Sequence, residues 1–268
     1  MDRIVERPAA LDVHKASVTA CVRVWQGREL QERMAEFATT VHGLLALRDW
    51  LEALGVTQVA MEATGVYWRP VWAILEDRFE LMLVNARHVK AVPGRKTDVK
   101  DSEWICQLVQ HGLVRPSFVP PPEIRRLRDL TRLRKAQTNE RTRSIQRLEK
   151  VLQDAGIKLT SVASQTYSKS ARAMLEALLS GVTDPEALAE LAKARMRSKI
   201  PQLREALANR FDVAHHGIMV AQLLAHIDSL EAAIATLDER IELMLAPHPG
   251  VPQLVGICGR DRRRDLAC

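Results

Sequence analysis

PAALDVHKASVTACVRVW, residues 8 to 25, is the stretch of sequence that decides the fold class. Its first seven residues are apolar except for Asp12 and His14, and residues 16 to 25 alternate loosely and are rich in valine. Short runs of β-branched and apolar residues are typical of strands. We therefore predict two neighbouring strands, followed by RELQERMAEF at 28–37 as a third strand that completes a meander.

Elements of alternating type follow this meander. Leucines recur at helical spacing in 39–55, where Thr39 or Thr40 can cap the helix and Gly55 can stop it. Strand, helix, strand and helix are then expected, in that order, at 57–63, 66–79, 80–85 and 99–112. A meander that leads into crossover units is the order of the α/β ribonuclease H-like fold, although a generic α/β sheet shares part of it.

Prolines at 115–122 (RPSFVPPP) separate this region from a second one of all-helical character. Their density favours an extended linker, so we predict one domain over 1–114 and a helical region over 123–246. A basic helix is expected at 123–154, which contains no Pro or Gly. The tail, 247–268, shows no clear periodicity.

Seven apolar residues near the end of the helical region recur at steps of four and three. Three heptads of this kind predict a coiled-coil seam. Its partner is either the basic helix, folded back as a hairpin, or the same helix of a second copy, which would make a homo-oligomer. The seam residues are Leu223, Ile227, Leu230, Ile234, Leu237, Ile241 and Met244.

Four carboxylates are candidate metal ligands. Asp12 interrupts one predicted strand and Glu62 ends another, while Asp98 and Asp101 open a helix three residues apart and share one of its faces. Singly, each has an ordinary explanation, such as a helix cap or a favourable charge in a first helical turn. Together they would meet at one sheet edge and repel one another strongly unless divalent cations lie between them. Mg²⁺ prefers carboxylate oxygens, and two such ions about 4 Å apart can activate a nucleophile and stabilise the leaving oxygen of a phosphodiester.

Three blocks carry a family resemblance: LDVHK at 11–15, MEATGVYW at 61–68 and GRKTDVKDSEWICQLVQHGLV at 94–114. In sequence and order they resemble the motifs of the DEDD transposases, the RuvC-like enzymes of the IS-one-ten insertion-sequence family. The resemblance implies a RuvC-like domain with Mg²⁺ held by Asp12, Glu62, Asp98 and Asp101. It also implies recombination of an insertion sequence in DNA, guided by a structured RNA.

Members of that family carry a further domain with a serine nucleophile. HPGV at 248–251 resembles its start, but the residues that follow do not continue it. We therefore expect this chain to be truncated or frameshifted before that domain. Two rival interpretations remain open: a stand-alone RuvC-like junction nuclease, and a binding or oligomerisation module without activity of its own.

Basic residues near the acids and on the basic helix suit contact with a nucleic-acid backbone. Ten Lys or Arg stand against four acids within 123–150, an excess of six positive charges that the helix itself does not relieve. A solvated loop and a solvated helix are the alternatives. The cations lie on more than one helical face, so base-specific reading of a groove is not implied. The candidate nucleic-acid-binding residues are Lys15, Arg87, Lys90, Arg95, Lys96, Lys100, Arg125, Arg126, Arg128, Arg132, Arg134, Lys135, Arg141 and Arg143.

Other site classes find little support. The four cysteines are far apart and form no CxxC pair, so reduced thiols are expected and a zinc site is not. His215 and His216 are adjacent and do not share a helical face, so no metal role is predicted for them. No run of about 18 apolar residues occurs, and residues 1–15 contain charges and a proline. A cytosolic protein without a membrane span is therefore expected.

Overall fold

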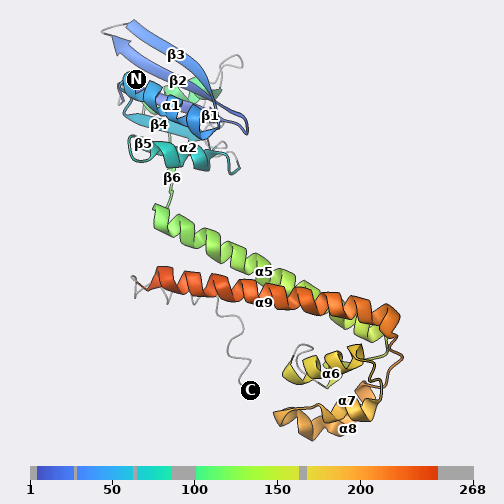
Figure 1. Cartoon of the computed structure of the whole chain (residues 1–268). Helices are drawn as coiled ribbons and strands as arrows, with labels where there is room; N and C mark the ends of the chain where they lie inside the picture. Colours follow the sequence, from blue (N-terminus) through green and yellow to red (C-terminus); the bar gives the residue numbers. More distant parts are fainter. Residues whose placement is uncertain (1–4, 27–28, 63–64, 86–100, 163–167, 247–268) are drawn as a thin grey trace. The chain divides into compact units, whose positions relative to one another are not determined.

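The chain divides into two compact units, a sheet unit (Met1–Pro120) and a helical unit (Pro121–Cys268). A computed structural model describes residues 5–26, 29–62, 65–85, 101–162 and 168–246 (Figure 1). The division between the units falls inside the proline-rich segment 115–122.

The sheet unit contains a mixed sheet with the strand order β3-β2-β1-β4-β5-β6. Its first three strands form an antiparallel meander: β1 (Pro8–Val13), β2 (Ser17–Gln26) and β3 (Glu29–Ala38). Two strands then pair in parallel, β4 (Gln58–Glu62) with β1 and β5 (Glu80–Val84) with β4. An antiparallel meander joined to parallel crossover strands confirms the predicted ribonuclease H-like fold class.

The sixth strand differs from the prediction. Pro116–Ser117 forms β6, which pairs antiparallel with β5 through Leu83↔Ser117 and Val84↔Pro116. From the sequence we expected only a linker here, because two residues are too few to show an alternating pattern. Proline is tolerated there because β6 lies at the sheet edge. On an edge strand one side of the backbone has no neighbouring strand, so a missing N–H donor on that side costs no hydrogen bond within the sheet.

Helices cover both faces of the sheet. α1 (Val41–Ala53) and α2 (Trp68–Leu75) lie over the face to which Ala9 and Leu11 contribute, and α4 (Asp101–Gln110) lies over the face of Ala10. Because successive strand residues point to opposite faces, a strand covered on both sides is apolar throughout. This explains why β1 is an almost uninterrupted apolar run and why a carboxylate within it is conspicuous.

Both ends of α1 match the residues expected there. The Thr40 side chain caps the helix by accepting from the Gly43 backbone N–H at 3.2 Å, and Gly55 follows the helix with a φ of +66°. That left-handed conformation favours glycine. Gly43 is required for a different reason, since a Cβ there would collide with the Ala38 carbonyl oxygen.

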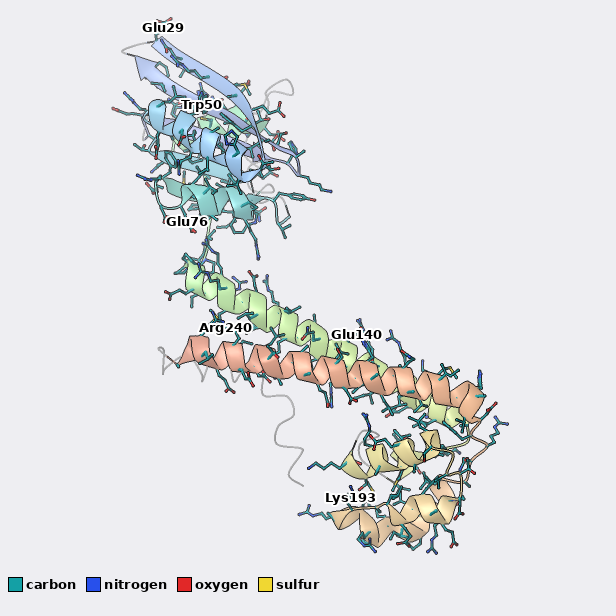
Figure 2. All side chains as sticks on the ribbon, in the orientation of Figure 1. Glu29, Trp50, Glu76, Glu140, Lys193 and Arg240 are labelled. Atoms are coloured by element: carbon teal, nitrogen blue, oxygen red, sulfur yellow. The ribbon has the colours of Figure 1, made fainter. Side chains whose placement is uncertain are left out.

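The helical unit is built on a two-helix hairpin of α5 (Pro122–Asp154) and α9 (Ile218–Leu245), which pack along each other (Figure 1). Figure 2 labels Glu140 on α5 and Arg240 on α9. The basic helix is therefore the partner of the predicted seam, and Ile227 and Ile241 are buried within the unit. Between the two arms the chain forms η1 (Leu159–Ser161), α6 (Lys169–Leu179), α7 (Pro185–Glu190), η2 (Ala194–Lys199), α8 (Ile200–Ala206) and the π-helical turn η3 (Val213–Gly217).

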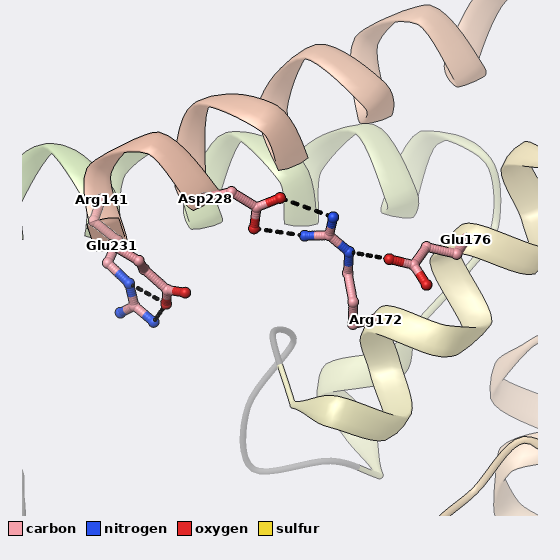
Figure 3. Close-up of polar contacts among 5 residues, drawn as sticks. All are labelled: Arg141, Arg172, Glu176, Asp228 and Glu231. Atoms are coloured by element: carbon pink, nitrogen blue, oxygen red, sulfur yellow. Dashed lines mark hydrogen bonds and ion pairs between the residues drawn. The ribbon is translucent and has the colours of Figure 1, made fainter. Parts of the chain in front are cut away.

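Charged pairs occupy the middle of the hairpin. Arg134 pairs with Asp238, and the Nε of Arg141 donates to a Glu231 carboxylate oxygen at 2.8 Å (Figure 3). α9 carries five carboxylates and one arginine. α9 therefore relieves part of the positive charge of the basic helix, through acids that lie outside the 123–150 segment.

Arg172 ties α6 to the same helix. Its two Nη atoms donate to both carboxylate oxygens of Asp228, at 2.7 and 2.8 Å, and its Nε donates to Glu176 at 2.7 Å (Figure 3). A bidentate contact of this kind fixes the orientation of both side chains. α9 is thus joined to two other helices through its carboxylates.

Val213–Leu245 is long and apolar enough to cross a membrane, by length and composition alone. One such helix is weak evidence for a membrane span. Packing in the helical unit is the better explanation for this helix. Each of its carboxylates Asp228, Glu231 and Asp238 pairs with an arginine on another helix.

Candidate metal centre

The strand register places Asp12 beside Glu62. β1 and β4 pair in parallel through Ala10↔Ala60 and Leu11↔Met61, so Asp12 and Glu62 occupy the next position on neighbouring strands. Ala10 and Ala60 pack under α4. Because residues two apart on a strand project from the same face, both carboxylates project from the face that α4 covers.

The direction of α4 brings Asp101 to the same edge. The Val5 N–H donates to the Gln110 carbonyl oxygen at 3.3 Å, and the Cys106 Sγ–H donates to the Pro8 carbonyl oxygen at 3.3 Å. The end of α4 therefore lies beside the start of β1, and the helix runs opposite to the strand. Its first residue, Asp101, consequently lies toward the end of β1 that carries Asp12.

The fourth predicted ligand, Asp98, lies outside the described residues, as do Arg87, Lys90, Arg95, Lys96 and Lys100. Asp12, Glu62 and Asp101 are each half-buried. Carboxylates at this depth can be held by the protein on one side and reached by water on the other. An all-carboxylate set with access for water fits the preferences of Mg²⁺, which takes oxygen ligands and retains several waters.

His14 adds a polar contact that the sequence analysis did not assign. Its Nε2 lies 3.2 Å from Oδ2 of Asp12, and the two side chains are 63% and 25% exposed. Their spacing in the sequence could have predicted this contact, because residues two apart lie on the same side of an extended segment. A ring nitrogen at this distance can donate a hydrogen bond to the Asp12 carboxylate.

A second cluster with metal-ligand chemistry lies in the helical unit, where potential ligand atoms of Asp154, His215 and His216 lie within 4.8 Å of one another. Hydrogen bonding argues against a cation there. The Asp212 N–H donates to Nδ1 of His216 at 3.0 Å, so the neutral ring carries its proton on Nε2, which lies 3.1 Å from Oδ2 of Asp154. A metal on Nε2 would have to displace that proton while Nδ1 remains an acceptor. His216 is therefore a structural histidine.

Two of the candidate nucleic-acid-binding residues face the hairpin interior. Arg134 and Arg141 form the ion pairs with α9, so their charges are already engaged within the fold. Arg143 lies 3.3 Å from Glu140, and the guanidinium groups of Arg147 and Arg143 lower the pKa of that carboxyl. Arg125 is half-buried. Arg143 is exposed, as are the candidates Lys15, Arg126, Arg128, Arg132 and Lys135.

A transposase family model, DEDD_Tnp_IS110, matches residues 9–157, more than half of the chain. The chain belongs to this transposase family. The matched range of this DEDD transposase includes β1, β4 and α4, which carry Asp12, Glu62 and Asp101, and it continues through α5.

The transposase is similar to a Thermus thermophilus RuvC structure. The two share 13% sequence identity, and the match covers 41% of this chain and 99% of that chain with a TM-score of 0.31. No curated protein sequence matches the chain.

Proposed function

We propose that this transposase performs metal-dependent phosphodiester chemistry on insertion-sequence DNA, with Asp12, Glu62, Asp98 and Asp101 as its Mg²⁺ ligands. One observation carries the proposal. The β1–β4 register and the direction of α4 bring the three described acids, from two strands and a helix, to one edge of the sheet. Carboxylate oxygens that come from two strands and a helix to one edge are the ligand type that Mg²⁺ prefers.

Within this site each residue has a limited task. Asp12 and Glu62 present carboxylate oxygens from the rigid sheet, and Asp101 presents one from the first turn of α4. His14 can donate a hydrogen bond to Asp12 through its 3.2 Å contact. Bound Mg²⁺ would polarise the scissile phosphodiester and lower the pKa of a coordinated water.

The partners of the site are also proposals. We expect DNA as the substrate and, from the family resemblance, a structured RNA as the guide. We also propose that two copies associate through α9, where Leu230 and Leu237 of the seam are only half-buried in the hairpin. We also propose that the protein acts on this DNA in the cytosol.

Magnesium binding tests the metal site directly. Thermal denaturation of the full chain is followed at increasing Mg²⁺ concentration for the wild type, for Asp12→Asn and for the matched control Asp49→Asn. Asp49 lies in the same unit, is 64% exposed and pairs with its neighbour Arg48, away from the site. A ligand that binds the folded state raises its stability by about 2.7 kcal/mol at one hundred times its Kd. We expect Mg²⁺ to stabilise the wild type and Asp49→Asn but not Asp12→Asn.

Equal stabilisation of all three proteins would refute the metal site. DNA cleavage by the same proteins supplies a second measurement. Loss of a metal ligand should reduce the rate at least 100-fold in Asp12→Asn, while Asp49→Asn should remain near the wild-type rate.

A junction nuclease is the second candidate, because the same acids on the same fold would serve it. Four-way DNA junctions and linear insertion-sequence ends distinguish the two functions. Robust cleavage of junctions by the chain alone, without any RNA, would favour the junction nuclease over the transposase.

A further inference from the structure

One face of α5 carries hydrogen-bond donors at every position. Seven residues at steps of three and four form a stripe along the helix, and all of them are exposed. Each side chain is a cation or an amide, and none is acidic or apolar. We call this set the donor stripe; its members are Arg128, Arg132, Lys135, Asn139, Arg143, Gln146 and Lys150.

The opposite face of α5 has a different task. This face buries Leu127, Ser144 and Leu148. It also carries Arg134 and Arg141, which pair with carboxylates of α9. Since the residues of an α-helix advance by 100° each, these positions lie about half a turn around the helix from the donor stripe. α5 thus has an inner face that holds the hairpin together and an outer face that contributes nothing to it.

A solvated surface helix is the alternative explanation, and such helices mix both signs of charge. Here the acids of the segment, Glu123, Asp129, Glu140 and Glu149, all lie off the stripe. Glu140, labelled in Figure 2, reaches Arg143 and Arg147.

At the other end of the stripe the cations remain uncompensated. Among the described residues of the chain, Arg128, Arg132 and Lys135 form no ion pair. Three neighbouring unpaired cations favour a polyanionic partner over solvent alone.

The length and composition of the stripe indicate the partner. From Arg128 to Lys150 the helix rises by about 33 Å, at 1.5 Å per residue. A nucleic-acid duplex presents phosphates about every 3.4 Å along each strand, so a row of this length meets several of them. α5 contains no Phe, Tyr or Trp, and single-strand binding relies on stacking of bases on aromatic side chains. A duplex backbone is therefore a better match than an unpaired strand.

We infer that the donor stripe of α5 binds the phosphate backbone of a nucleic-acid duplex without reading its sequence. This inference rests on the proposed function for the view that the protein acts on nucleic acid, and it deepens that proposal by assigning a surface. DNA and RNA duplexes share the chemistry that the stripe recognises. Arg134 and Arg141 are excluded from this contact.

The salt dependence of binding tests the inference. Affinity of the full chain for a 30-base-pair DNA duplex is measured from 50 to 300 mM NaCl by fluorescence anisotropy. The stripe variant carries Arg128→Gln, Arg132→Gln and Lys135→Gln. The control carries Lys169→Gln, Lys193→Gln and Arg195→Gln, exposed cations off the stripe and outside the candidate nucleic-acid-binding residues, so both variants lose three charges; Lys193 is labelled in Figure 2.

We expect the slope of log K against log salt to be less steep by about 2.7 in the stripe variant. Each of the three lost phosphate contacts contributes about 0.9 to the steepness for duplex DNA. If the affinities of the stripe variant and the wild type converge at 1 M salt, the affinity of the variant at 100 mM salt should be about 500-fold lower by the same relation. The control should lose less than about 1 from the slope. Circular dichroism and melting temperature should be unchanged in both variants, since all the replaced residues are exposed.

Equal slopes for the two variants would overturn the inference, since binding would then depend on net charge alone. Binding of a single strand as tightly as the duplex would also overturn it. Parallel titrations with an RNA duplex identify which duplex the stripe prefers. Asp12→Asn separates this inference from the proposed function: it should keep the wild-type slope while losing cleavage. If Asp12→Asn cleaves normally, the proposed metal site fails and the donor stripe stands.

Discussion

Replacement of His216 distinguishes a structural histidine from a metal ligand. Its side chain is 9% exposed, accepts from the Asp212 N–H at 3.0 Å and lies 3.1 Å from the Asp154 carboxylate. The ring also lies against Phe211, with centroids 5.5 Å apart. His216 thereby joins the end of α5 to the turn that begins α9.

The loss in the free energy of unfolding expected for His216→Ala follows from these contacts. Each hydrogen bond contributes about 1 kcal/mol. His216→Ala loses both hydrogen bonds and removes a buried ring, so we expect a loss of about 3 kcal/mol. His216→Asn should lose about half as much, because the Asn side-chain oxygen can accept from the same N–H. His215→Ala, at an exposed neighbour, should change the free energy of unfolding by less than about 0.5 kcal/mol.

Thermal denaturation followed by circular dichroism at 222 nm measures these differences, with and without added Zn²⁺. A change of 1 kcal/mol shifts Tm by about 2–4 °C at this size, so His216→Ala should melt about 6–12 °C lower. The zinc arm decides the assignment. If Zn²⁺ raises the wild-type Tm by several degrees and His216→Ala abolishes that rise, the structural explanation is wrong and Asp154, His215 and His216 form a metal site.

Three further predictions concern the two units. Thr40→Ala should lower the stability of the sheet unit by about 1 kcal/mol in urea unfolding, because the Gly43 N–H loses its cap, whereas Thr40→Ser should not. A double-mutant cycle with Gln at Arg141 and Glu231 should give a coupling of about 0.5–1 kcal/mol, since these side chains are 32% and 41% exposed and solvent screens the pair; zero coupling would show that the pair contributes nothing. The hydrogen bond to Cys21 and burial raise the pKa of the Cys106 thiol, so at pH 8 it should stay protonated and resist iodoacetamide until urea unfolds the chain; rapid labelling of the native protein, by mass spectrometry, would contradict this.

Local sequence determined much of the sheet unit. Strand and helix order, the cap at Thr40 and the stop at Gly55 depend on neighbours within a few residues, and so they could be predicted. Asp12 and Glu62 were conspicuous for the same reason, since a charge within a buried strand breaks a local pattern. That Asp12 and Glu62 lie at neighbouring strand positions depends on the pairing of β1 with β4, which only the tertiary structure shows.

In the helical unit the local sequence pattern does not predict the roles of the charged residues. Along α5 the residues that pair with α9 are arginines, and the cations of the donor stripe are arginines and lysines too. The sequence of this helix alone therefore does not distinguish the two sets. What separates them is the position of α9, whose carboxylates lie 90 and 104 residues away in the chain. The sequence by itself determined that α5 is a basic helix. The tertiary structure decided which of its charges hold the fold together and which face outward, because the side on which a partner helix packs is set by contacts distant in sequence.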